Sequence, residues 1–104
     1  MRAFVVPVLP AVSRAVRDQL DRASLSVVLN TAEGAGRFAP RDKARFYSIA
    51  RGSANETVAL LDVVRAETGD GNGHAGTILS ARRRAVRVIQ MLVKLERRFG
   101  AQGR

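Results

Sequence analysis

The sequence predicts an all-α protein, an antiparallel helical bundle of three long helices. Apolar residues recur at helical spacing in three separate runs, and almost no strand-like alternation follows Pro10. Two glycine-containing stretches separate the runs, and long helices joined by short connections pack as antiparallel neighbours. The chain is therefore expected to form a single domain, 1–104, with 1–10 as an irregular N-terminal segment, 69–76 as a glycine-rich loop and 100–104 as a tail.

The first run predicts an amphipathic helix of about 22 residues, with Pro10 in its first turn and its end near Gly34. Its apolar positions recur close to the helical period at Val12, Val16, Leu20, Ala23, Val27 and Ala32. The chain then turns at "EGAGRF". We expect Gly34 to adopt the left-handed conformation that ends many helices, and Gly36 to give the corner a second flexible point.

This corner lacks the marks of a nucleotide-binding loop. A Walker loop needs a lysine followed by Ser or Thr after its second glycine, and a dinucleotide fingerprint needs a third glycine. Both also need a preceding strand, whereas the segment before Gly34 is predicted to be helical. A compact DNA-reading helix–turn–helix fits poorly as well, because the flanking helices are long. The corner is therefore interpreted as a connection between helices.

The second run begins at "FAPRDKARF", where Pro40 suits a first helical turn and Asp42 suits the positive end of a helix. Its periodic positions are Phe46, Ile49, Ala50, Ser53, Thr57, Leu60, Leu61 and Val64. It ends at "ETGDGNGHAG", whose four glycines cannot sustain a helix and predict a mobile loop.

The third run is expected to begin after Thr77, a candidate N-cap, and to fade at "GAQGR". Its apolar positions are Ile78, Leu79, Ala85, Val86, Ile89, Leu92, Val93, Leu95 and Phe99. This segment also holds most of the excess charge. The chain carries 18 Lys and Arg against 9 Asp and Glu, and residues 74–104 hold eight of the basic residues and one acid, Glu96.

Three interpretations of the basic third helix remain open. Arginine forks bind phosphate oxygens, which favours a face for RNA or DNA. An amphipathic helix on a membrane surface is a weaker alternative, since Phe99 is the one aromatic residue in the run. The third interpretation is a solvated face whose arginines pair with acids of a neighbouring subunit. The phosphate interpretation selects ten residues as nucleic-acid-binding candidates: Arg37, Arg41, Lys43, Arg82, Arg83, Arg84, Arg87, Lys94, Arg97 and Arg98.

The segments "DQLDRASLSVVLNTAEGAGR" and "ARFYSIARGSANE" resemble the four-helix bundle family of the 23S rRNA intervening-sequence protein. The resemblance covers about residues 18–61, and the third run matches only in character. Family members usually carry another long helix before the Gln-Leu pair, which is Gln19-Leu20 here. The resemblance therefore implies a four-helix bundle whose N-terminal helix is short or missing in this chain. The matching residues are Gln19, Leu20, Arg22, Ala23, Ser26, Asn30, Ala32, Glu33, Gly34, Gly36, Arg37, Phe46, Ala50, Arg51, Gly52, Ser53 and Glu56.

The resemblance implies a small homo-oligomer, with a pentamer favoured, and no established enzymatic activity. A distant relative is the accessory protein of diversity-generating retroelements, a basic pentameric bundle associated with nucleic acid and a reverse transcriptase. The implied function is binding of RNA or DNA, or an accessory role to an enzyme that acts on them. The alternative is a structural or protein–protein interaction module whose basic residues serve subunit contacts.

The polar residues of this motif have structural interpretations. We expect Asn30 to hydrogen-bond to the facing helix, and Glu33 to pair with Arg37 or Arg45 across the corner. Gly52, in mid-helix, would permit a close approach of Ser24 or Ala23, because glycine there otherwise costs about 1 kcal/mol against alanine. Glu56 and Gln19 are expected to meet across the same pair of helices.

Residues for catalysis or cofactor binding are sparse. The chain has no cysteine and one histidine, His74, so neither a thiolate metal site nor a Ser–His–Asp arrangement finds support. Glu33 has no second acid or base near it in the sequence, and the lone Tyr47 is expected to pack. We therefore expect no enzyme, no cofactor, no metal, no small-molecule substrate and no membrane association. The absence of cysteine and of a signal peptide suits the cytoplasm.

Overall fold

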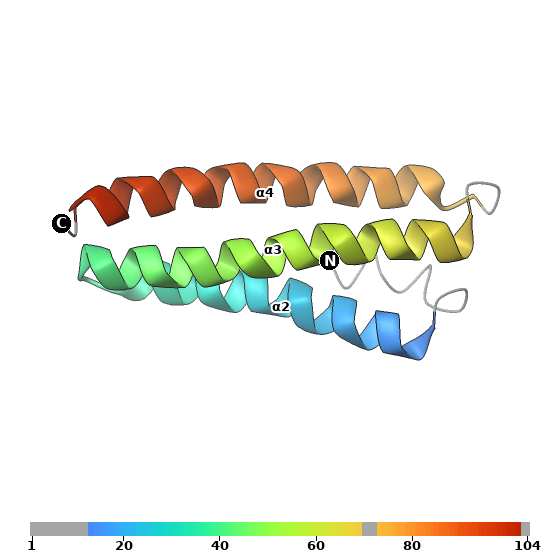
Figure 1. Cartoon of the computed structure of the whole chain (residues 1–104), viewed down its shortest axis with the longest axis horizontal. Helices are drawn as coiled ribbons and strands as arrows, with labels where there is room; N and C mark the ends of the chain where they lie inside the picture. Colours follow the sequence, from blue (N-terminus) through green and yellow to red (C-terminus); the bar gives the residue numbers. More distant parts are fainter. Residues whose placement is uncertain (1–12, 70–72, 103–104) are drawn as a thin grey trace.

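The computed structural model describes residues 13–69 and 73–102, which form three long helices. Helix α2 spans Arg14–Gly36, α3 spans Pro40–Thr68 and α4 spans Ala75–Gln102. The helices run side by side in alternating directions, with α3 between the other two (Figure 1). These residues contain no strand. The predicted all-α antiparallel bundle is therefore confirmed.

Helix α2 begins at a serine cap. The side chain of Ser13 accepts a hydrogen bond from the backbone N–H of Val16 at 3.3 Å, which satisfies one of the free donors of the first turn. The backbone N–H of Ser13 donates to Glu67 Oε2 at 3.1 Å. The start of α2 is thus tied to the last turn of α3. The predicted start at Pro10 lies outside the described residues.

The corner between α2 and α3 differs from the expectation. Helix α2 continues through Gly34 to Gly36, and its C-cap is Arg37 in an extended conformation (φ −80°, ψ 151°). Among the described glycines, positive φ occurs at Gly69 and Gly73 and not at Gly34 or Gly36. The prediction of a left-handed Gly34 was therefore wrong. Gly34 is buried, and a Cβ atom on it would lie 2.9 Å from Cε1 of Tyr47, so glycine is needed here for close packing.

The ends of α3 follow the prediction. Pro40 occupies its first turn with Asp42 close behind, and Gly69 ends it with φ +72°. Helix α4 begins at Ala75, so Thr77 is not its cap, and it continues to Gln102. Residues 75–76 of the predicted 69–76 loop and residues 100–102 of the predicted 100–104 tail are therefore helical. Residues 1–10 and 70–72 lie outside the described part of the chain.

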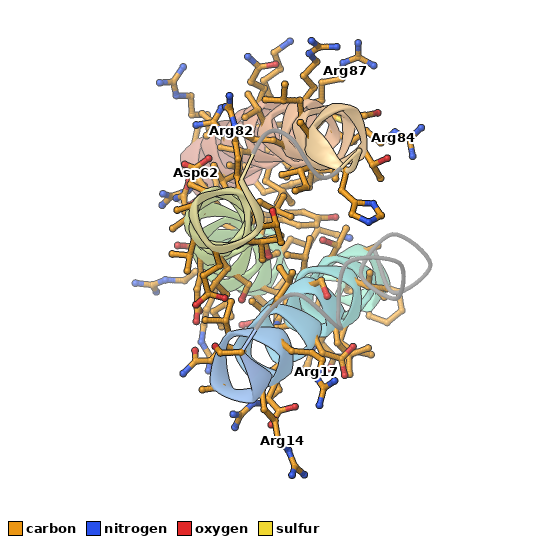
Figure 2. All side chains as sticks on the ribbon, turned by 90° about the vertical axis from the view of Figure 1, so that its right-hand side faces the viewer. Arg14, Arg17, Asp62, Arg82, Arg84 and Arg87 are labelled. Carbon is orange, nitrogen blue, oxygen red and sulfur yellow. The ribbon has the colours of Figure 1, made fainter. Side chains whose placement is uncertain are left out.

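Helix α3 supplies the centre of both hydrophobic clusters. In the first, Leu61 and Val64 of α3 contact Leu20 of α2 together with Ile78 and Ala81 of α4. In the second, the buried residues Tyr47, Ala50 and Ala54 of α3 and Leu92 of α4 pack with the partly buried Val27, Val88, Ile89, Leu95 and Phe99. Helices α2 and α4 both pack along α3 and touch each other little. In the end-on view of Figure 2, they lie on different sides of α3.

The two small residues of mid-helix α3 play different roles. The Ser53 hydroxyl lies 2.7 Å from the Ser26 hydroxyl of α2, a hydrogen bond that joins the two helices. Gly52 is exposed, and a Cβ atom on it would meet nothing within 4 Å. The predicted close approach of Ser24 or Ala23 to Gly52 was therefore wrong, because Gly52 faces away from α2. Nothing in the packing explains glycine at this position.

Substituting Gly34 tests the packing of the corner. Gly34→Ala places a methyl group against the Tyr47 ring, and we expect it to lower the free energy of unfolding by about 1–3 kcal/mol. Gly36→Ala is the matched control, because it meets open space in the same helix, and alanine there stabilises a helix by up to about 1 kcal/mol. Urea unfolding of both variants measures the difference. Equal effects of the two substitutions would contradict the contact.

Candidate nucleic-acid interface

One side of α4 carries a row of cations. The buried residues of α4, Ile78, Ala81, Ala85 and Leu92, lie on the side that packs against α3. Exposed basic residues occupy the opposite side at spacings that return to one face of a helix. Figure 2 shows Arg87 pointing away from α3. We call this surface the basic face of α4; it consists of Arg83, Arg87, Lys94, Arg97 and Arg98.

The basic face contains no compensating acid. Among the described residues, no carboxylate lies within ion-pair distance of its five cations. From Arg83 to Arg98 the face extends about 22 Å along the helix, at 1.5 Å per residue. Five positive charges within that length repel one another, and an anionic partner would relieve the repulsion.

The single acid of α4 points elsewhere. Glu96 of α4 accepts hydrogen bonds from Nε of Arg51 in α3, and from Nη2 of the same residue at 3.2 Å. The Arg51 guanidinium therefore binds the carboxylate through two nitrogens. The Glu96 side chain is 19% exposed. The hydrogen bonds that Arg51 donates to Glu96, and then the negative charge of that carboxylate, raise the pKa of Arg51, while partial burial opposes the rise. The pair links α3 to α4, and it leaves the outer side of α4 purely basic.

Two further predicted residues of α4 lie away from the basic face. Arg82 Nε donates to Asp62 Oδ1 of α3 at 2.9 Å, so its charge already has a partner, as Figure 2 shows. Arg84 is exposed on the other flank of the helix, at the edge of a groove between α4 and α2. The structure thus divides the predicted run Arg82, Arg83 and Arg84 among three directions.

The predicted corner residues have local partners of their own. Arg37 Nη2 lies 2.7 Å from Glu33 Oε1, the expected ion pair, and its guanidinium stacks over the ring of Phe46 at 4.8 Å. Lys43 Nζ donates to the carbonyl oxygens of Gly34 at 3.2 Å and Ala35 at 3.0 Å. Lys43 therefore caps the C-terminus of α2, a role that the sequence analysis did not assign to it. Arg41 is exposed.

The corner lies beside the C-terminal end of the basic face. Lys43 Nζ is 5.4 Å from the centroid of the Phe99 ring, and the Tyr47 and Phe99 rings are 5.9 Å apart. Phe99 is the neighbour of Arg98 in the chain, so the corner cations and Arg98 share one end of the bundle. The fold therefore brings together residues that are more than fifty positions apart in the sequence.

Phe38 was not among the predicted site residues. It lies in the corner and is 98% exposed, between Arg37 and Pro40. An exposed aromatic ring beside cations is suited to stacking on a nucleic-acid base. The available signal was its place in the connection, outside the periodic positions of both flanking helices. The other aromatic residues of the described chain, Phe46, Tyr47 and Phe99, are buried or partly buried.

The polar motif residues form a seam between α2 and α3. Asn30 Nδ2 donates to the carbonyl and hydroxyl oxygens of Ser26 at 2.9 and 3.0 Å, and Ser26 bonds to Ser53 across the interface. Asn30 therefore acts within its own helix and orients Ser26, rather than reaching α3 directly as expected. Gln19 and Glu56 line the same shallow surface groove near this pair. These contacts hold helices together and leave no cluster of acids and bases.

Over residues 13–69 and 73–102, no three side chains of His, Asp or Glu gather closely enough to hold a metal ion. No helix in the same residues combines the length and hydropathy that a membrane crossing needs.

The Arg51–Glu96 pair makes a prediction about stability. Glu96→Gln removes the charged acceptor from a partly buried, two-pronged contact, and we expect a loss of about 1 kcal/mol in the free energy of unfolding. Asp62→Asn is the matched control at the more exposed Arg82 pair, with an expected loss below about 0.5 kcal/mol. Thermal unfolding of the two variants measures both losses of stability. A larger effect at Asp62 than at Glu96 would show that the burial difference has been misjudged.

Comparison with known proteins identifies the family. No curated protein and no solved structure matches the chain. The family model described as 23S rRNA-intervening sequence protein matches residues 10–69. This span contains α2, the corner and α3, together with all the motif residues from Gln19 to Glu56, whereas α4 lies beyond it. The chain belongs to the family of 23S rRNA-intervening sequence proteins.

Proposed function

We propose that this protein is a non-catalytic, oligomeric bundle that binds RNA or DNA through backbone phosphates, as an accessory to an enzyme that acts on nucleic acid. The observation that carries the proposal is the basic face of α4, with five exposed cations and no ion-pairing carboxylate among the described residues. Phosphate backbones are the extended anions that such a row of charge fits best.

The chemistry of the side chains supports phosphates over other anions. Four of the five cations are arginines, whose planar forks donate two parallel hydrogen bonds to a phosphate group. All five project from one rigid helix, so they need little ordering when a polyanion binds. Charges spread over about 22 Å match a polymer better than a single small anion.

Reading of base sequence is expected to be weak. Phosphate contacts carry no direct sequence information, and α4 presents no exposed aromatic residue along the basic face. Phe38 at the corner is the one fully exposed aromatic side chain in the described residues. It would stack on an unpaired base without selecting its identity strongly.

The alternative function is a structural or protein–protein module in which the arginines serve subunit contacts. The distribution of apolar surface favours the nucleic-acid proposal over this one. Leu25 and Leu29 of α2 are 49% and 58% exposed and lie one helical turn apart on its outer side, which suits a subunit contact. The basic face lies on a different helix, and it remains available in an oligomer that assembles through α2. The pentamer favoured by the family resemblance is part of this proposal.

Charge removal on the basic face tests the proposal directly. The variant R83Q/R87Q/K94Q should bind a mixed-sequence RNA or duplex DNA roughly tenfold or more weakly, because three phosphate contacts are lost. R14Q/R22Q/R45Q is the matched control, since it removes three exposed charges from α2 and α3 and lowers the net charge equally. Fluorescence anisotropy gives the affinities, and light scattering gives the subunit number. Equal weakening by both variants would show that only the net charge of the protein matters and would contradict the basic face as the binding site. Dissociation of the oligomer by R83Q/R87Q/K94Q would favour the protein–protein module.

Salt dependence gives an independent prediction. If all five cations contact phosphates of duplex DNA, the logarithm of the binding constant should fall against the logarithm of salt concentration with a slope of about −4.5. The triple variant should lower the size of this slope by about 3. Binding that changes little between low and moderate salt would contradict contact through phosphates.

A further inference from the structure

A groove runs between α2 and α4, beside α3. Its floor is formed by Ala54 of α3, and its walls by Val27 and Val28 of α2 and by Ala85 and Val88 of α4. The groove has a volume of about 240 Å³ and is lined mainly by apolar atoms. Arg84 lies at the α4 edge of the groove. Figure 2 shows Arg84 on the flank of α4 opposite Arg82.

The groove is an apolar space beside the hydrophobic core that the described side chains leave unfilled. Val28 is 62% exposed, although Val27 beside it packs into the second hydrophobic cluster. The alanines at the floor and on α4 keep the groove open, because their side chains end short of the space between the helices. The volume is below the roughly 300–1,000 Å³ typical of pockets for drug-sized ligands, which favours a few apolar side chains as the occupant.

We propose that the groove is the docking site for residues 4–9 of the same chain, "FVVPVL". This segment lies outside the described residues, and five of its six side chains are large and apolar. Pro7 within it and Pro10 after it have no backbone N–H and favour an extended conformation of about 3.1 Å per residue. Such a strap can fill an apolar groove with side chains without forming a fourth helix.

The reach of the segment agrees with the position of the groove. Ser13 is fixed at the start of α2 by its hydrogen bond to Glu67. Ser24, at the near end of the groove, lies eleven residues further on, or about 17 Å along α2 at 1.5 Å per residue. An extended chain that runs back from Ser13 along α2 covers about 16 Å by Val8. Val8 and its apolar neighbours therefore come level with the groove.

Tethering favours this segment over other occupants. A segment joined to the groove by a few residues has an effective concentration in the millimolar range, above that of a second copy in ordinary solution. Docking of the segment depends only on the apolar contacts of the groove and on the length of the connecting chain. It is independent of the proposed function, because it involves no residue of the basic face.

Disulfide trapping tests the docking, and the natural chain contains no cysteine to interfere. Val6 and Val28 both lie about 22 Å from Ser13 along the bundle, at 3.1 Å per extended residue and 1.5 Å per helical residue. The variant V6C/V28C in the full chain should form an intramolecular disulfide under mild oxidation, seen as a faster-migrating monomer on a non-reducing gel. V6C/G52C is the matched control, because Gly52 is exposed beside the Ser53–Ser26 contact at a similar height along the bundle but on the other side of α3. We expect it to cross-link at least about ten times more slowly, since disulfides need Cα atoms within about 7 Å.

The outcomes are distinct. Faster intramolecular cross-linking of V6C/V28C than of V6C/G52C supports docking. A disulfide that forms only between chains would show that a second copy occupies the groove, and it would overturn the proposal. Equal rates in the two variants, or no cross-link in either, would overturn it as well.

A second measurement does not depend on introduced cysteines. The full-length variant V5S/V8S/L9S should show a lower unfolding temperature and several times stronger fluorescence of a hydrophobic dye, because the groove is uncovered. Val63→Ser, at an exposed valine on α3, should change neither quantity appreciably. Unchanged temperature and dye fluorescence in V5S/V8S/L9S would contradict docking of the segment.

Discussion

The buried stripe of α3 packs against two helices at once, and the other features of the bundle follow from this arrangement. Tyr47, Ala50 and Ala54 serve one hydrophobic cluster, and Leu61 and Val64 serve the other, with residues of α2 and α4 on either side. Because both neighbours lie along α3, they have little contact with each other. The gap between them is the apolar groove, and the side of α4 remote from α3 is free of packing. The positions of groove and basic face therefore have one cause.

The separation of charge on α4 has a similarly simple origin. Its inner side must pack against α3, so its cations are confined to the outer side and the two flanks. The one acid in the helix, Glu96, binds Arg51 at the edge of the interface and does not neutralise the outer side. Asp62 of α3 neutralises Arg82 on one flank. What remains is a row of five cations whose mutual repulsion lowers stability unless an anion is present.

Much of the fold could be predicted from local chemistry. Pro40 and Gly69 mark the ends of α3, because proline suits a first helical turn and glycine tolerates the left-handed cap. Two roles that the sequence does not reveal depend on a distant partner. Gly34 accommodates the ring of Tyr47, and Lys43 caps α2, so neither role is visible without the packing of α2 against α3. Gly52 illustrates the reverse case, in which a conspicuous residue faces solvent.

The candidate site shows the same division. Composition alone located the excess charge in the last helix, but periodicity could not say which arginines already had acidic partners. The structure separates Arg82, which is paired, from Arg83 and Arg87, which are not. The family match reaches residue 69 and therefore includes the shared stripe and the polar seam, whereas the basic face belongs to α4 beyond it. The proposed function therefore depends on α4, the helix that lies outside the family match.

The most direct test follows the arginine side chains themselves. In a nuclear magnetic resonance titration with a short mixed-sequence RNA, the Nε–Hε signals of Arg83, Arg87, Arg97 and Arg98 should shift together. Those of Arg51 and Arg82, already bound to Glu96 and Asp62, should stay near their initial positions. Shifts confined to arginines of α2 and α3, or no shifts at RNA concentrations that saturate binding, would contradict the basic face of α4 as the site of contact.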